Sequence, residues 1–147
     1  MVPKISAICV SKRKGTRKKE VQSVRLIKDY GIEGDAHAGS EKRQVSILTE
    51  KSIEHMKSLG LKLNFGDFGE NIVVRGLSFE DFKKGDLIRL GKNALGEVTV
   101  LGKECHTRCA IFYKTGDCIM PREGVFLKIT KGGKIKKGDR IRMVQRK

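Results

Sequence analysis

The stretch KKGDLIRL, residues 83–90, shows how this chain is built. Its Gly-Asp pair is typical of a tight turn, and the alternation of apolar and polar positions after it is typical of a β-strand with one buried face. The pattern returns as KKGDRIRM at residues 136–143, where the same turn would begin another strand. The similarity is too short to define a tandem repeat. It indicates instead that a Gly-Asp turn leads into a strand at both places, which is common in barrels of short strands.

The same alternation occurs in short segments along most of the chain, each bounded by residues typical of turns. The predicted strands occupy residues 5–11, 21–27, 44–49, 71–76, 86–90, 97–102, 110–113, 125–130 and 140–144. Within ITKGGKI, Gly132 and Gly133 predict the two-residue turn of a hairpin over residues 129–135. We therefore expect a mainly β fold, barrel-like and built of short strands with a few helices.

One segment has the periodicity of a helix instead. Ile53, Met56 and Leu59 recur on one helical face. Thr49 is a suitable N-cap, and Gly60 stands where helices commonly end. These signals predict a helix of about three turns.

Length and composition bound the class of protein. A chain of 147 residues with 38% hydrophobic content can bury one substantial core, and no linker rich in Ser, Gly or Pro divides it, so we expect a single domain over residues 1–147. No apolar run approaches the roughly 20 residues of a membrane helix, and the start lacks the apolar segment of a signal peptide. The sequence therefore predicts a cytoplasmic protein with no membrane association. In that reducing compartment its four cysteines are expected to be metal-binding, catalytic or buried rather than bridged.

The chain is strongly basic. Its 32 Lys and Arg against 17 Asp and Glu give a formal net charge of +15, which favours an anionic partner, either nucleic acid or a phosphorylated small molecule. The densest cluster, SKRKGTRKK at residues 11–19, is equally typical of a solvated loop. No aromatic residue is interleaved with it, which argues against a stacking surface for single-stranded nucleic acid.

Three cysteines lie in KECHTRCAIFYKTGDCIMPREG, residues 103–124. The potential zinc ligands of this stretch are Cys105, His106, Cys109 and Cys118. Their C-x3-C and C-x8-C spacing departs from the C-x2-C pairs usual in structural zinc sites. The alternative is a reactive thiolate at Cys109, which follows Arg108 directly and begins a predicted strand, because neighbouring cations favour a thiolate. Cys9, in contrast, alternates like a core residue.

Two glycine-rich stretches carry further polar residues, GIEGDAHAG at residues 31–39 and NFGDFGENIVVRG at residues 64–76. The first does not match a nucleotide-binding motif. His37 in the first could be a ligand, a proton carrier or a structural residue, and Arg43 follows it closely. In the second, Glu70 and Asn71 could point into a site or could pin a turn by bonding to nearby backbone.

These stretches, in this order, resemble a MOSC domain, the domain named for the C-terminal part of molybdenum cofactor sulfurase. The stretches that carry the resemblance are GIEGDAHAG, RQVSILTEKSIE, FGDFGENIVVRGLSFEDFKKGDLIRLG, GKECHTRC and MPREGVFLKITKGGKIKKGDRIRM. The similarity runs from about Ile5 to Met143 and has the proportions of the small stand-alone bacterial and archaeal members. It implies a β-rich, barrel-like fold.

The resemblance also implies a site built around one cysteine, which either ligates the molybdenum of the molybdenum cofactor or carries sulfur toward it as a persulfide. Cys109 aligns with that cysteine, with Cys105 as its nearest competitor. A molybdopterin carries dithiolene sulfurs and a phosphate, so its host needs a soft thiolate and cations. We therefore expect Cys109 to be the catalytic residue and the metal ligand. The expected cofactor-binding residues are His37, Arg43, Asn71, Lys103, Arg108 and Arg122.

Three functions follow as hypotheses, beside the fourth possibility of a zinc-stabilised structural domain. The first is a protein that holds, sulfurates or delivers the molybdenum cofactor through Cys109. The second is a cofactor-dependent reductase of N-hydroxylated compounds, and the third is a basic nucleic-acid-binding module that uses residues 11–19. The sequence shows no counterpart of the β-barrel extension of amidoxime-reducing members or of the desulfurase domain of the eukaryotic sulfurase. We therefore expect partners, namely a cysteine desulfurase, cofactor-biosynthesis or acceptor proteins, or a reductase, while enzyme status and oligomeric state stay open.

Overall fold

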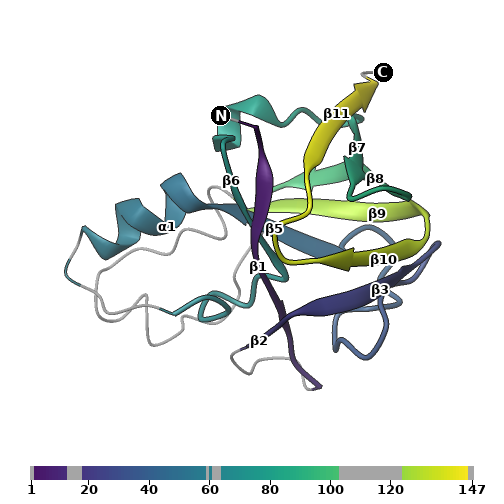
Figure 1. Cartoon of the computed structure of the whole chain (residues 1–147), viewed down its shortest axis with the longest axis horizontal. Coiled ribbons are helices and arrows are strands. Elements are labelled where there is room, and N and C mark those ends of the chain that lie inside the picture. The colour runs from purple at the N-terminus through teal and green to yellow at the C-terminus, as the bar shows by residue number, and fades with distance from the viewer. Residues whose placement is uncertain (1, 13–17, 59, 61–63, 103–123, 146–147) are drawn as a thin grey trace.

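The structure is a computed structural model, and it describes residues 2–12, 18–58, 60, 64–102 and 124–145. Figure 1 shows a mainly β architecture with one α-helix projecting to one side. The elements are, in chain order, β1 (Lys4–Val10), β2 (Lys19–Val21), β3 (Ser23–Ile27), β4 (Gly31–Ile32), β5 (Val45–Thr49), α1 (Glu50–Lys57), β6 (Ile72–Arg75), a 3-10 turn (Phe79–Asp81), β7 (Leu87–Leu90), β8 (Ala94–Leu101), β9 (Val125–Lys131), β10 (Gly133–Lys136) and β11 (Ile141–Gln145).

The strands form two sheets. The larger has eight strands in the order β11-β7-β8-β9-β5-β6-β1-β2, and the smaller has three in the order β10-β3-β4. Of the neighbouring pairs that the structure describes in the large sheet, only β5 and β6 run parallel. Its edge strand β11 returns to β1, because Lys4 forms an isolated bridge with Arg140 and the Ile141 N–H donates to the Pro3 carbonyl at 3.0 Å. The mainly β, barrel-like prediction is thus confirmed, although no continuous ladder among the described strands closes the barrel.

Two hydrophobic cores lie on opposite faces of the large sheet, as the alternation of side chains along a strand requires. Along β9, Val125 and Leu127 belong to the larger core, which also includes the buried side chains of the small sheet. Phe126 between them belongs to a second core with α1. Cys9 is fully buried in that second core, so its predicted place in a core is confirmed.

The two KKGD stretches fold into the same turn. The Asp86 N–H donates to the Lys83 carbonyl at 3.0 Å, and the Lys83 N–H donates to the Asp86 carboxylate at 2.9 Å. The same two bonds recur between Lys136 and Asp139, at 3.1 and 3.0 Å. The glycine of each turn has a positive φ angle, 94° in the first and 93° in the second. The strands that follow, β7 and β11, pair with each other.

The hairpin predicted over residues 129–135 is wrong. Neither Gly132 nor Gly133 has a positive φ angle, and β10 pairs with β3 in the small sheet. A Cβ atom on Gly132 would lie 2.7 Å from the Leu26 carbonyl oxygen. Glycine is therefore needed here because two segments approach each other closely, and not because the chain needs a two-residue turn.

The helix is shorter than predicted. Thr49 is its N-cap, accepting from the Ser52 N–H at 3.2 Å, and Ile53 and Met56 are buried as expected. The helix ends at Lys57, so Gly60 lies beyond its C-cap. No helix in the described ranges is long and apolar enough to cross a membrane.

The predicted strands are mostly confirmed. The strand expected over residues 21–27 is divided between β2 and β3, and the short strand β4 was not predicted, whereas β10 was expected only as the second arm of the hairpin. The strand expected over residues 110–113 lies outside the described residues.

Asp86 and Asp139 hold equivalent turns, but their different burial should give them different contributions to the free energy of unfolding. Asp86 is 1% exposed, whereas the Asp139 side chain is 18% exposed. We expect Asp86→Ala to lower the free energy of unfolding by about 2 kcal/mol and Asp139→Ala by about 1 kcal/mol, because a backbone N–H left without its acceptor costs more when water cannot reach it. Urea unfolding of the two variants measures the difference, and equal losses would contradict the role given to burial.

Candidate functional site

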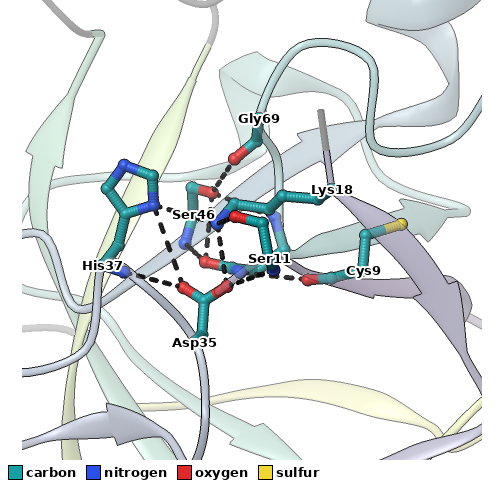
Figure 2. A network of polar contacts seen from close by, with 8 residues as sticks. Cys9, Ser11, Lys18, Asp35, His37, Ser46 and Gly69 are labelled. Carbon is teal, nitrogen blue, oxygen red and sulfur yellow. Dashed lines mark hydrogen bonds and ion pairs between the residues drawn. The ribbon is translucent and has the colours of Figure 1, made fainter. Parts of the chain in front are cut away.

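A buried lysine stands at the centre of a polar cluster formed by the end of β1, the start of β2 and the loop after β4 (Figure 2). Lys18 is only 3% exposed. Its Nζ lies 2.8 Å from Oδ1 of Asp35, 2.9 Å from Nδ1 of His37 and 3.2 Å from Oγ of Ser11. These contacts join three segments that are separate in the sequence.

Asp35 is the counter-ion of Lys18. Its carboxylate also accepts from the Ser11 N–H at 3.0 Å and from the His37 N–H at 3.1 Å. Burial alone would raise the pKa of Asp35, but the hydrogen bond from Lys18 and those from the two backbone N–H groups outweigh it, so the pKa lies below its ordinary value. Asp35 is therefore an anion that fixes the backbone at both ends of the cluster.

The glycine-rich loop before β6 supports the backbone of Lys18. The Lys18 N–H donates to the Gly66 carbonyl at 3.1 Å. Gly66 has a φ angle of 95°, and a Cβ atom there would lie 2.1 Å from the Lys18 carbonyl oxygen. Only glycine fits this position, both in conformation and in space.

Glu70 ties that loop together. Its carboxylate accepts from the Gly66 N–H at 2.9 Å and from the Phe68 N–H at 3.1 Å, and the residue is fully buried. Burial raises the pKa of Glu70 to about 7, against the opposing effect of these backbone hydrogen bonds. Of the two positions considered for Glu70, pointing into a site or pinning a turn, the structure shows the second.

Asn71 fastens three neighbouring strands. Its side-chain Oδ1 accepts from the Ser46 N–H at 3.0 Å, and its Nδ2 donates to the Cys9 carbonyl at 3.1 Å. Asn71 is fully buried. This is a supporting position beside the Lys18 cluster, to which β1 connects it two residues further on at Ser11. A direct contact between Asn71 and a cofactor stays a prediction.

Arg43 lies on the face of the large sheet to which the Phe126 side chain points. Its side chain is exposed, with the guanidinium carbon 5.7 Å from the centroid of the Phe126 ring. Phe126 is opposite Ser46 in the β5–β9 ladder, so their side chains share a face. The exposed guanidinium of Arg43 therefore lies over a ring that shares its face of the sheet with Ser46.

The strand ends that carry the cysteine-rich segment adjoin this region. Leu101 pairs with Val125 at the end of the β8–β9 ladder, and beyond them the Gly102 N–H donates to the Gly124 carbonyl at 2.6 Å. Thr99, two residues before Leu101, hydrogen-bonds the Lys42 carbonyl. The loop that bears His37 and Arg43 therefore packs beside the point where the chain leaves β8 and returns to β9.

The remaining predicted site residues lie outside the described residues. These are Cys109, Lys103, Arg108 and Arg122, together with the possible zinc ligands Cys105, His106 and Cys118. Among the residues that the structure does describe, no three His, Cys, Asp or Glu side chains gather as a metal site would require.

Sequence reasoning missed Lys18, Asp35 and Ser46. Lys18 belongs to the basic cluster at residues 11–19, and for this residue a solvated position is wrong. Its burial leaves no signal in a run of lysines and arginines. Asp35 did have one, because it stands two residues before His37 in a glycine-rich loop, where an aspartate commonly bonds to the backbone two residues on.

Comparison with known families identifies the class. The family model described as MOSC domain matches residues 34–142, which is most of the chain. The chain therefore belongs to the MOSC domain family, which is generally linked to functions of the molybdenum cofactor.

Solved structures share the fold at low identity. YuaD from Bacillus subtilis is 17% identical, with a TM-score of 0.78 over 99% of this chain and 98% of that one. YiiM from Escherichia coli is 18% identical, with a TM-score of 0.69 over 98% of this chain and 71% of that one. YiiM from Geobacillus stearothermophilus is 19% identical, with a TM-score of 0.70 over 97% and 75%. A search of curated protein sequences finds no match.

The contact between Gly66 and Lys18 can be tested against a second glycine of the same loop. Gly69 also has a positive φ angle, 79°, but no described atom lies within 4 Å of a Cβ built there. Both alanine substitutions should cost roughly 1–2 kcal/mol of backbone strain. Gly66→Ala should lower the free energy of unfolding by at least about 2 kcal/mol more than Gly69→Ala does, because the methyl group would displace the Lys18 backbone. Urea unfolding compares them, and equal costs would show that this contact does not constrain the site.

Glu70 predicts a pH dependence of stability. Its folded pKa of about 7 exceeds the ordinary value of 4.5, so the folded state binds this proton more tightly than the unfolded state does. The resulting stabilisation is present below about pH 4.5 and is lost as the pH rises through 7. At 1.36 kcal/mol per pKa unit the loss is on the order of 3 kcal/mol. The lowered pKa of Asp35 acts with the opposite sign, in more acidic solution.

The measurement is urea unfolding across this pH range. In Glu70→Gln the decline should disappear, whereas Glu54→Gln should keep it, because the Glu54 side chain is 70% exposed. A decline of the same size in Glu70→Gln would assign it to another group.

Proposed function

We propose that this chain binds the molybdenum cofactor and uses the Cys109 thiol to hold, sulfurate or deliver it. Membership of the MOSC family supports a function related to this cofactor. The matched residues 34–142 include Cys109 together with the other proposed cofactor-binding residues, namely His37, Arg43, Asn71, Lys103, Arg108 and Arg122.

One structural observation carries the proposal. The loop of His37 and Arg43 packs against the strand ends that bear the cysteine-rich segment, through the contact between Thr99 and the Lys42 carbonyl. Groups from the first half of the chain therefore adjoin the base of the segment that contains Cys109. A site shared by the two halves requires this arrangement.

The chemistry of the available groups fits the cofactor. An exposed guanidinium at Arg43 and an imidazole at His37 suit an anionic ligand, and the net charge of +15 favours its approach. Cys109 would provide the soft thiolate that molybdenum prefers, and Lys103, Arg108 and Arg122 further cations for the phosphate. When bound, the cofactor would supply redox chemistry or an acceptor for sulfur.

Loading of Cys109 with sulfur needs a donor protein. In this step the Cys109 thiolate would attack the terminal sulfur of a persulfide on a cysteine desulfurase. The sulfur–sulfur bond of the donor breaks as the new one forms, so the desulfurase thiolate leaves and Cys109 becomes a persulfide. The exchange consumes no external oxidant or reductant.

The proposal predicts a specific loss of metal and pterin. Protein purified from a host that makes the cofactor should contain molybdenum and show pterin fluorescence. Both should fall at least tenfold in Cys109→Ser, because a hydroxyl is a poor ligand for a soft metal, and should persist in Cys105→Ser. Elemental analysis for molybdenum and zinc, together with pterin fluorescence, makes the comparison.

Other outcomes would redirect the function. Zinc without pterin, lost in both serine variants, would indicate a structural clamp and overturn the proposal. Loaded protein that turns over hydroxylamine-type substrates with an electron donor would favour the reductase. Protein without cofactor that binds nucleic acid with a steep salt dependence would favour the third hypothesis.

A further inference from the structure

The contact between Lys18 and His37 determines which nitrogen of the imidazole carries the proton. Nζ of Lys18 lies 2.9 Å from Nδ1 of His37. An ammonium group has three hydrogens and no lone pair, so it can only donate. Nδ1 must then accept, and the proton of the neutral ring belongs on Nε2.

The reverse arrangement, a neutral amine that accepts from Nδ1–H, is disfavoured by Asp35. Its Oδ1 lies 2.8 Å from Nζ, and neither side chain has exposed surface. The two groups form an ion pair, in which Nζ donates to the carboxylate. With Ser11 Oγ at 3.2 Å, the three hydrogens of the ammonium have three acceptors.

Asp35 does not act as the carboxylate of an Asp-His pair. Its Oδ2 lies 3.8 Å from Nδ1 of His37, which is beyond hydrogen-bond distance. That oxygen accepts instead from the backbone N–H of His37 at 3.1 Å. Asp35 therefore fixes the loop at His37, and Lys18 fixes the ring.

We infer that Lys18 is a positioning residue that holds His37 as a neutral Nε2–H donor. In Figure 2 Nε2 points away from Lys18 and Asp35, and the His37 side chain is 30% exposed. A protonated Nε2 has no lone pair with which to bind a metal or accept a proton. Either role would require the ring proton to move to Nδ1, where it would face the ammonium of Lys18.

In this tautomer His37 can donate a hydrogen bond through Nε2, and an anionic oxygen or sulfur is a suitable acceptor. That this atom is an oxygen or sulfur of the molybdenum cofactor rests on the proposed function. The tautomer itself does not, because it follows from contacts within the protein.

The direct test is nitrogen NMR of histidine-labelled protein that carries no cofactor. The chain has three histidines, and His37→Gln identifies the resonances of His37. We expect the Nε2–H tautomer near neutral pH. An Nδ1–H tautomer, or an imidazolium ring, would overturn the inference.

Variants of Lys18 test whether this residue sets the tautomer of His37. Lys18→Met alone would leave Asp35 buried without its counter-ion, so the double variant Lys18→Met with Asp35→Asn removes both charges together. The His37 ring should then populate both tautomers, whereas Lys18→Arg, which keeps a charged donor, should retain the original one. A double variant that still shows only the Nε2–H form would mean that Lys18 does not set it.

A pair of His37 variants tests whether the ring donates a hydrogen bond to the cofactor. His37→Gln keeps an N–H donor and should retain several-fold more pterin and molybdenum than His37→Leu, which has none. Equal loss in both variants would indicate a ligand or a base, and would overturn the donor role. If the wild-type protein retains no cofactor, the proposed function fails, and the tautomer is still decided by NMR.

Discussion

The buried ion pair between Lys18 and Asp35 is the interaction on which the candidate site depends. Transfer of both charges out of water costs several kcal/mol per ion, and the cost is offset only where the remaining hydrogen-bonding capacity is used. Here the ammonium has a second and a third acceptor, and the carboxylate accepts from two backbone N–H groups. The end of β1, the start of β2 and the loop after β4 are therefore held in one arrangement.

Neighbouring contacts extend this arrangement without further charges. Gly66 supports the backbone of Lys18 because it has no side chain, and Asn71 joins β1, β5 and β6 through its amide. Both residues lie just before β6, in the FGDFGENIVV part of the sequence at residues 65–74. The two glycine-rich stretches that resemble family motifs thus meet at Lys18, which belongs to neither of them.

The sequence predicted the fold better than the site. The turn at KKGD and the capped helix depend on a few consecutive residues, so local patterns are enough to find them. The partner of β10 was missed because Gly132 could make a turn or a close approach, and only the position of Leu26 decides between them. Lys18 was missed for a similar reason, since its burial depends on Asp35 and Gly66, which are distant in the chain.

The hydrogen bond between Gly102 and Gly124 has a consequence for how such a protein can diversify. It closes the β8–β9 ladder at a fixed point, whatever length of chain lies between the two glycines. The entropic cost of closing a loop grows only with the logarithm of its length, by about 0.6 kcal/mol for each doubling. Insertions and replacements between these residues therefore change the free energy of folding of the β framework little. The cysteine-bearing segment can acquire new chemistry while the sheet that presents it stays the same.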